Sequence, residues 1–130
     1  MIRCGQIVFL SHLVEDSIIK CEQYWPDDSA TRLYGVVRVT LTRTTSFANF
    51  IVRSFRVAHA DEDFDHPVTQ YHFTAWPEHG VPRHPLALLE FHAKVSAGGP
   101  ACAINSCYID SEWSRDPIFE KSYDELTKNL

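Results

Sequence analysis

The chain has 130 residues and a formal net charge of −5, and 45% of its residues are hydrophobic. This composition is typical of a packed domain, and the length fits a single one. The acidic balance disfavours a nucleic-acid partner. No apolar run reaches the roughly 18–20 residues that span a bilayer. Ser11 and His12 end the apolar run 6–10 too early for a secretory signal.

The cysteines and histidines form none of the closely spaced pairs that metal sites use. Four cysteines lie at uneven spacings, and the seven histidines include no HxxxH pair. We therefore expect reduced thiols and no disulfide scaffold, and we expect neither a metal nor a cofactor. The four cysteines are Cys4, Cys21, Cys102 and Cys107.

The first half of the chain is rich in strand patterns. Residues 6–13 form a short apolar run that predicts a strand. Residues 36–44 and 50–58 alternate apolar and polar side chains and contain many β-branched residues, as in half-buried strands. The short link 45–49 predicts that these two strands pair as an antiparallel hairpin.

The second half contains one more strand and one helix. Residues 60–67 carry four acidic residues and no periodicity, which predicts a surface loop, whereas 70–76 alternate like a strand. Residues 85–97 carry an apolar stripe at helical spacing, with Pro85 at the start and the Gly-Gly-Pro sequence 98–100 as a stop. Beyond residue 100 the pattern weakens.

These elements predict an α/β domain with a mainly antiparallel, twisted sheet, one clear helix and a poorly specified C-terminal tail. A helix of about 13 residues is about 20 Å long and covers only part of one sheet face. We therefore expect the other face and at least one edge to be unprotected, and the chain to be one piece of a larger architecture. Marginal stability and flexible residues beyond Pro100 would follow.

Two segments, 20–26 and 71–82, have unusual compositions. In the second, an aromatic strand ends at Trp-Pro and is followed by Glu78, a histidine and a glycine between two prolines. A carboxyl group on such a loop is well placed to act as a mobile general acid or base. A structured turn without chemistry is the plainer alternative. For the first segment we expect a supporting role, with Tyr24 and Trp25 as packing residues.

Taken together, these motifs resemble the protein tyrosine phosphatase family, and in particular receptor-type catalytic domains. Residues 6–26 are similar to the family's central strand and its KCxQYWP motif, and 34–57 are similar to the strand pair that follows. Residues 73–82 resemble the FxxWPDHGVP motif of the family's mobile acid loop. Shorter similarities follow at 99–100 and 107–110.

The resemblance implies hydrolysis of phosphotyrosine through a cysteinyl-phosphate. In the family, a Cys in an HCxxxxxR loop attacks phosphorus, and the loop's amides and its Arg hold the phosphate oxygens. The acid of the WPD motif protonates the leaving oxygen. Glu78 matches this general acid, Trp76 matches the hinge anchor, and Gly80 matches the flexible position. Pro77 and His79 complete the matching loop.

The HCxxxxxR loop itself has no counterpart in this sequence. Neither Cys102 nor Cys107 follows a histidine, and neither has an Arg six residues later. We therefore expect residues 1–100 to form a partial tyrosine-phosphatase-like domain and 101–130 to be a divergent tail that replaces the phosphate-loop region. No nucleophile can be assigned.

Glu78 also departs from the family pattern, because active members have Asp at this position. The additional methylene moves the carboxyl by about 1.5 Å, and a misplacement of about 1 Å can cost about a hundredfold in rate. A Glu here resembles the second, weakly active or inactive domains of tandem receptor phosphatases.

Three functional hypotheses follow. The first is a phosphatase-family fragment without phosphatase activity, on the cytoplasmic side of a membrane receptor if the chain belongs to a longer receptor-type protein. The second is a non-catalytic binding or decoy module for a phosphotyrosine protein or a sibling phosphatase domain, through strand addition. The third is an unrelated Cys or metal enzyme built on Cys102, Cys107 and the scattered histidines.

Overall fold

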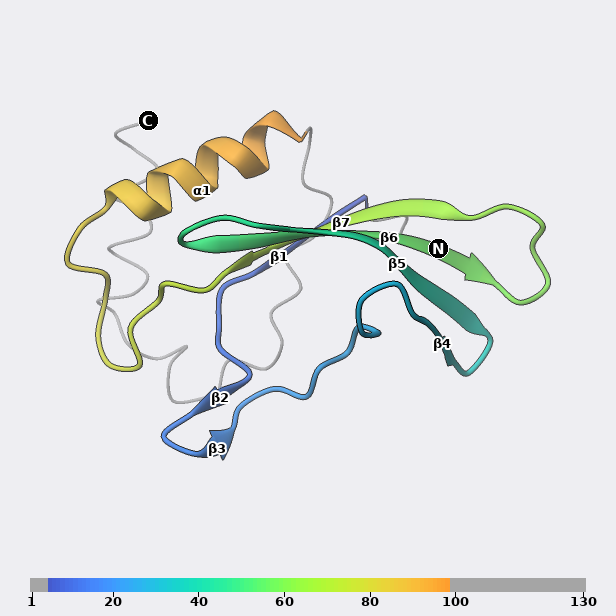
Figure 1. Cartoon of the computed structure of the whole chain (residues 1–130), viewed down its shortest axis with the longest axis horizontal. Coiled ribbons are helices and arrows are strands. Elements are labelled where there is room, and N and C mark those ends of the chain that lie inside the picture. Colours follow the sequence, from blue (N-terminus) through green and yellow to red (C-terminus); the bar gives the residue numbers. More distant parts are fainter. Residues whose placement is uncertain (1–4, 99–130) are drawn as a thin grey trace.

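The computed structural model describes residues 5–98, which contain seven strands and one helix. Five strands form one sheet in the order β1-β7-β6-β5-β4, and β2 and β3 form a separate small hairpin (Figure 1). The predicted C-terminal tail lies outside the described residues. The elements are β1 (Gln6–Phe9), β2 (Val14–Glu15), β3 (Ile18–Ile19), β4 (Thr31–Tyr34), β5 (Val37–Ser46), β6 (Phe50–His59), β7 (His66–Phe73) and α1 (Leu86–Ala97).

The five-stranded sheet is mainly antiparallel, as predicted. β4 with β5, β5 with β6 and β6 with β7 pair antiparallel, whereas β1 pairs with β7 in parallel. The hairpin of β5 and β6 is confirmed, with a register shift between Leu41 and Arg43. Because β1 and β7 run in the same direction, their carboxyl ends lie together, and the segments that follow them leave the sheet at the same end of the strands.

Two strands were predicted with the wrong boundaries. The first strand ends at Phe9 instead of residue 13, because the chain turns there into the segment that leads to β2. The strand predicted at 70–76 is β7, which begins earlier and ends at Phe73. Pro67 fits within β7 because Thr69, two residues later, directs its N–H towards β1 (2.9 Å to the Gly5 carbonyl). The nitrogen of Pro67 therefore points to the same side, before β1 begins, and no ladder hydrogen bond is lost.

Three short strands, β2, β3 and β4, were not predicted. β2 and β3 are joined by Asp16 and Ser17, whose φ angles of 50° and 63° are those of a tight two-residue hairpin turn. β4 is exposed along most of its length and shows no alternation that would mark it as a strand. Such short elements depend on their partner strand rather than on their own pattern.

Both faces of the sheet are covered by other parts of the chain (Figure 1). The helix face is the one covered by α1. The Trp25 face is the one covered by the irregular segment 10–26, from which Trp25 packs into the sheet. The expectation of an uncovered second face is therefore wrong. The buried members of the two hydrophobic clusters are Phe50, Tyr71, Phe73 and Phe91 on the helix face and Phe9, Trp25, Leu41 and Phe55 on the Trp25 face.

The helix begins and ends as its sequence predicts. Pro85 lies at its N-cap and Ala97 is its last residue. Gly98 has ordinary helical dihedral angles, so its role is not that of a left-handed cap. A Cβ at this position would collide with the Tyr71 hydroxyl and the Gln6 amide. The absence of a side chain at Gly98 thus leaves room for these two side chains at the end of the helix.

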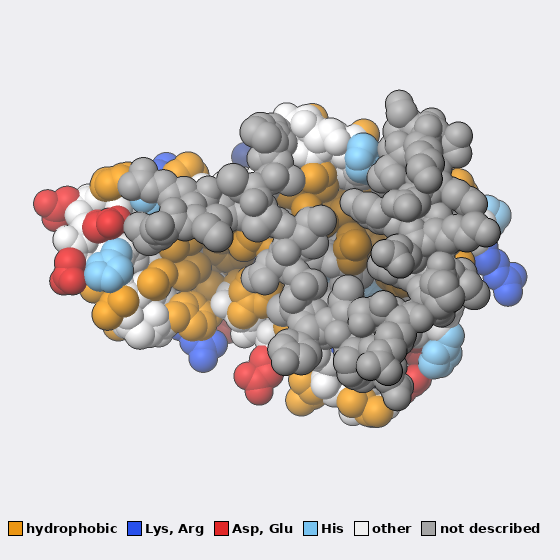
Figure 2. All heavy atoms as spheres, turned by 180° about the vertical axis from the view of Figure 1, so that it is seen from behind, with side chains coloured by type: hydrophobic (Ala, Val, Ile, Leu, Met, Phe, Trp, Pro, Cys, Tyr) orange, Lys and Arg blue, Asp and Glu red, His pale blue; other side chains and the backbone are white. Residues whose placement is uncertain are grey.

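Large apolar side chains also reach the surface. Figure 2 shows hydrophobic side chains gathered on the side of the molecule turned away from the viewer in Figure 1. Isolated exposed apolar residues are ordinary, but neighbouring ones mark a contact surface. In the described part the large exposed hydrophobic residues are Val14, Ile18, Ile19, Leu33, Val36, Phe47, Phe64, Val81 and Leu86.

Candidate active site

The candidate site lies where the parallel strands β1 and β7 end. In α/β sheets the carboxyl ends of parallel strands are the usual place for ligands. Residues 10–13 follow β1, and residues 74–82, here called the acid loop, follow β7. The two segments touch, since His12 Nε2 donates a hydrogen bond of 2.5 Å to the carbonyl oxygen of Trp76.

The acid loop is anchored at its beginning and exposed at its tip. The Trp76 ring packs against the buried side chains of the helix face, with its centroid 6.4 Å from that of Phe73. Pro77 is half-buried, whereas Glu78, His79 and Gly80 are exposed. Because Gly80 has a φ of 80°, a glycine is the residue best suited to this turn.

A second contact joins the loop tip to the β2–β3 hairpin. His79 Nε2 lies 3.5 Å from Asp16 Oδ2, and both side chains are largely exposed. The hairpin turn, with its positive φ at Asp16, places this carboxylate beside the loop. Exposed ion pairs contribute little to stability, so this contact orients the loop only weakly.

Glu78 extends into solvent from the loop. Within residues 5–98 it makes no hydrogen bond or ion pair. An exposed carboxyl group can exchange a proton with a molecule that approaches from solvent, and the neighbouring Gly80 gives the backbone freedom to move. The predicted loop residues 76–80 are therefore together on one loop, with Glu78 accessible.

Behind this loop lies a buried polar cluster on the Trp25 face, made of Tyr24, Arg53, Gln70 and His72. Gln70 is fully buried and His72 is 7% exposed. Arg53 Nη1 donates to Gln70 Oε1 (2.9 Å), and Gln70 Nε2 donates to the Tyr24 hydroxyl (2.7 Å). The Arg53 guanidinium also lies over the Trp25 ring, 4.6 Å from its centroid. Hydrogen bonds thus satisfy polar groups that would otherwise be costly to bury.

His72 is neutral in this cluster. Its Nδ1 accepts from Arg53 Nη1 (3.2 Å) and its Nε2–H donates to the Ser11 carbonyl (3.2 Å), an arrangement that needs the neutral tautomer. Burial, and next the positive charge of Arg53, lower the pKa of His72 to about 4. Burial likewise lowers the pKa of Arg53, and the carboxylate of Asp28 opposes this effect.

This cluster connects to the acid loop through adjacent residues. Ser11 accepts the hydrogen bond from His72, and its neighbour His12 donates to Trp76. The predicted packing role of Tyr24 and Trp25 is confirmed, because Trp25 is buried and Tyr24 packs against it. His12 and Asp16 were not predicted as neighbours of the loop. Only the parallel pairing of β1 with β7 could have indicated them.

The remaining predicted chemistry falls mostly outside the described residues, since Cys102 and Cys107 lie there. Cys21 lies within them, and its Sγ donates to the Glu22 carbonyl (3.3 Å). No group of three or more metal-binding side chains occurs in residues 5–98. The helix described in that range is too short to cross a membrane.

Comparison with known proteins places these features in one family. The model of the protein-tyrosine phosphatase family matches residues 2–111. Receptor-type tyrosine-protein phosphatase U of Gallus gallus is 43% identical over 97 residues, covering 75% of this chain and 7% of that protein. Receptor-type tyrosine-protein phosphatase S of Gallus gallus is 42% identical over 98 residues, 75% of this chain and 6% of that protein.

A mammalian relative gives the same result. Receptor-type tyrosine-protein phosphatase F of Bos taurus is 38% identical over 98 residues, again 75% of this chain and 5% of that protein. The chain thus spans less than a tenth of the length of these relatives. The sheet and the helix described in residues 5–98 are part of the α/β fold of that family. The chain belongs to the protein-tyrosine phosphatase family.

Proposed function

We propose that the chain carries the acid-loop part of a phosphotyrosine phosphatase domain and does not itself hydrolyse phosphotyrosine. In this proposal residues 1–100 form the partial domain and 101–130 stand in place of the phosphate loop. Glu78 occupies the general-acid position, with Trp76 as hinge anchor, and Pro77, His79 and Gly80 complete the loop.

One observation carries the proposal: no cysteine of the chain follows a histidine, and none has an arginine six residues later. Phosphoryl transfer to a cysteine needs a thiolate within a ring of amides beside a guanidinium. Glu78 alone can supply a proton but cannot attack phosphorus. Loss of the nucleophile from such a concerted site costs many orders of magnitude in rate.

The remaining expectations belong to this proposal as well. The proposed partners are phosphotyrosine proteins. The proposed location of the chain is the cytoplasmic side of a membrane receptor, if the chain is part of a longer receptor-type protein. Metal and cofactor have no role in the proposed chemistry.

Turnover assays test the proposal directly. The purified chain is incubated with p-nitrophenyl phosphate and with a phosphotyrosine peptide, beside a Cys102→Ala/Cys107→Ala control. We expect both proteins to release phosphate at the rate of the buffer blank. Turnover by the unmodified chain well above the double variant would show that one of these cysteines is a nucleophile and would refute the proposal.

A second candidate function is supported by the exposed edge of the sheet. β4 pairs only with β5 among the described residues, and its Leu33 is 64% exposed. Such an edge favours a binding or decoy module that takes a phosphoprotein or a sibling phosphatase domain by strand addition. Calorimetry with a phosphotyrosine peptide and with an intact phosphatase domain tests it, and no heat from either would count against it.

A further inference from the structure

The outer edge of β4 presents free backbone groups at a regular spacing. The amide of Leu41 donates to the Ala30 carbonyl (3.1 Å), so this pair is hydrogen-bonded. In an antiparallel ladder, hydrogen-bonded and non-hydrogen-bonded pairs alternate. Given the register of β4 with β5, Arg32 and Tyr34 direct their backbone groups towards β5. Thr31 and Leu33 therefore direct theirs outward.

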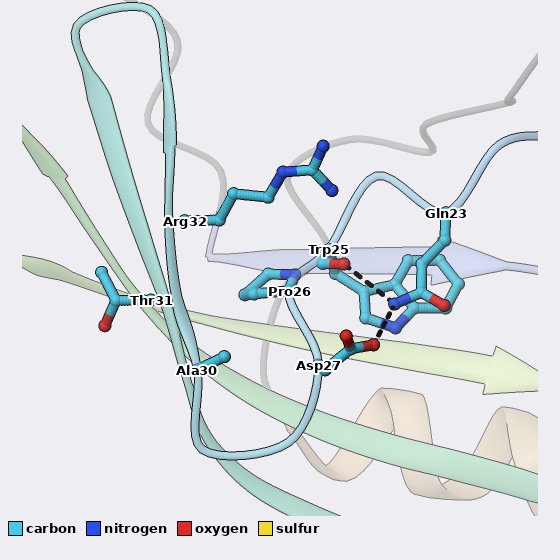
Figure 3. A pocket seen from close by; sticks show the side chains of 7 residues that line it. All are labelled: Gln23, Trp25, Pro26, Asp27, Ala30, Thr31 and Arg32. Carbon is cyan, nitrogen blue, oxygen red and sulfur yellow. Dashed lines mark hydrogen bonds between the residues drawn. The ribbon is translucent and has the colours of Figure 1, made fainter.

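A pocket of about 330 Å³ lies beside this edge (Figure 3). Figure 3 shows that Arg32 extends over Pro26 on the same side as Trp25, while Thr31 points away. This agrees with the register, because Arg32 lies opposite Val39, which packs on the Trp25 face. The lining residues are Gln23, Trp25, Pro26, Asp27, Ala30, Thr31 and Arg32.

The pocket contains one carboxylate, of Asp27, and one guanidinium, of Arg32, and they differ in the contacts that they already make. Asp27 accepts a hydrogen bond from Gln23 Nε2 (3.2 Å). The Arg32 guanidinium lies over the Tyr34 ring, 5.2 Å from its centroid, and within residues 5–98 it forms no ion pair. The cation of the pocket is therefore open to an incoming carboxylate.

The same cation disfavours pairing of β4 with a second copy of itself. The outward groups of Thr31 and Leu33 are symmetric about Arg32, so an antiparallel pair of two β4 edges would place Arg32 opposite Arg32. Like charges directly opposite each other destabilise a sheet. A charged residue in the middle of an edge strand is a common device against self-association.

We propose that the outer edge of β4 binds an extended acidic peptide as an added strand. The peptide exchanges main-chain hydrogen bonds with Thr31 and Leu33, and its central Asp or Glu lies opposite Arg32 over the pocket. Its neighbouring apolar side chain packs on the exposed Leu33, on the opposite face. This inference rests on the second candidate function and gives it a surface and a partner chemistry.

Fluorescence anisotropy with the whole chain tests the proposal. The probes are three labelled peptides of alternating Thr and Val that differ only in a central Glu, Gln or Lys. We expect the Glu peptide to bind about threefold more tightly than the Gln peptide, and the Lys peptide to bind most weakly. Arg32→Glu should invert this order.

Two substitutions at one position separate the backbone from the side chain. Leu33→Pro removes the outward N–H without removing a ladder hydrogen bond, and should weaken Glu-peptide binding at least tenfold. Leu33→Thr keeps the N–H and should remain within about threefold of the unmodified chain. Circular dichroism checks that each variant is folded. If Leu33→Pro does not fold, the inverted peptide preference of Arg32→Glu still tests the proposal.

Three results would overturn the proposal. They are equal binding by the Leu33→Pro and Leu33→Thr variants, an unchanged peptide preference after Arg32→Glu, and a dimer in sedimentation that Leu33→Pro dissolves. None of the probes carries phosphate. If these peptides do not bind, only the acidic-peptide proposal fails. The second candidate function fails separately, if calorimetry shows no binding of a phosphotyrosine peptide or of an intact phosphatase domain.

Discussion

The two faces of the sheet are buried in different ways. On the helix face, a regular helix packs Phe91 against Phe50 and Phe73, with ring centroids 5.5 and 5.2 Å apart. On the Trp25 face, an irregular segment covers the sheet, and the burial includes Gln70 and His72. The first face is stabilised mainly by apolar packing, with Gln6 as a buried polar side chain, and the second depends more on hydrogen-bonded polar groups.

The difference follows from the kind of chain that covers each face. A helix satisfies its own backbone groups, so it needs only an apolar stripe to pack on a sheet. An irregular segment leaves carbonyls and amides that need partners from elsewhere. His72 supplies one by donating to the Ser11 carbonyl. Mutations should therefore act through lost volume on one face and through unsatisfied groups on the other.

The largest effect is expected on the helix face. Phe73→Ala removes a side chain that is 1% exposed, and should lower the free energy of unfolding by about 3–5 kcal/mol through lost burial and a cavity. Urea unfolding followed by circular dichroism measures it. The control is Phe64→Ala at an exposed position, which should change stability by less than about 0.5 kcal/mol. Similar losses in both variants would contradict a packed helix face.

On the Trp25 face, loss of a hydrogen-bonding partner should matter more than loss of volume. Gln70→Leu keeps the size but removes the hydrogen bonds that Gln70 makes with Arg53 and with the Tyr24 hydroxyl, and should cost about 1–3 kcal/mol. The double variant Gln70→Leu/Arg53→Met should lose less free energy of unfolding than the sum of the losses in the two single variants, because the groups belong to one cluster. Simple additivity in urea unfolding would refute such coupling.

His72 should make the stability depend on pH. Its pKa is lowered in the folded chain to about 4 from 6.5, so between these values the unfolded chain binds more protons. The stabilisation is present above about pH 6.5 and is lost as the pH falls towards 4, by about 3 kcal/mol. The guanidinium of Arg53 faces the ring, and the titratable side chain of His12 also acts on it.

The measurement is a series of urea unfolding curves between pH 7 and pH 4. His72→Gln should be less stable at pH 7 and should show a shallower loss on acidification than the unmodified chain. Equal slopes for the two proteins would mean that other groups account for the acid sensitivity.

The smallest effect is expected at the acid-loop tip. His79→Ala removes the exposed contact with Asp16 and should change stability by less than about 0.5 kcal/mol. His12→Ala, which removes the anchor to the Trp76 carbonyl, should cost about 1 kcal/mol. Thermal melts compare the two variants. A larger loss for His79→Ala would show that the tip, rather than the beginning, holds the loop.

Much of the fold could be predicted from the sequence, where a pattern is local and strong. The alternation in 36–44 and 50–58 predicted the central hairpin, and the apolar stripe predicted the helix with its end at Ala97. The aromatic and proline motifs predicted the position of the loop that carries Glu78. These features are encoded by neighbouring residues, whose side chains must share one face or one turn.

Other features depend on residues far apart in the chain, and only the tertiary structure decided them. The parallel pairing of β1 with β7 brings His12 to Trp76, 64 positions away. The covering of the second sheet face by Trp25, the neutral state of His72 and the outward edge of β4 also need a partner that no local pattern specifies. A period in the sequence tells which side chains share a face, but the free energy of burial decides what covers that face.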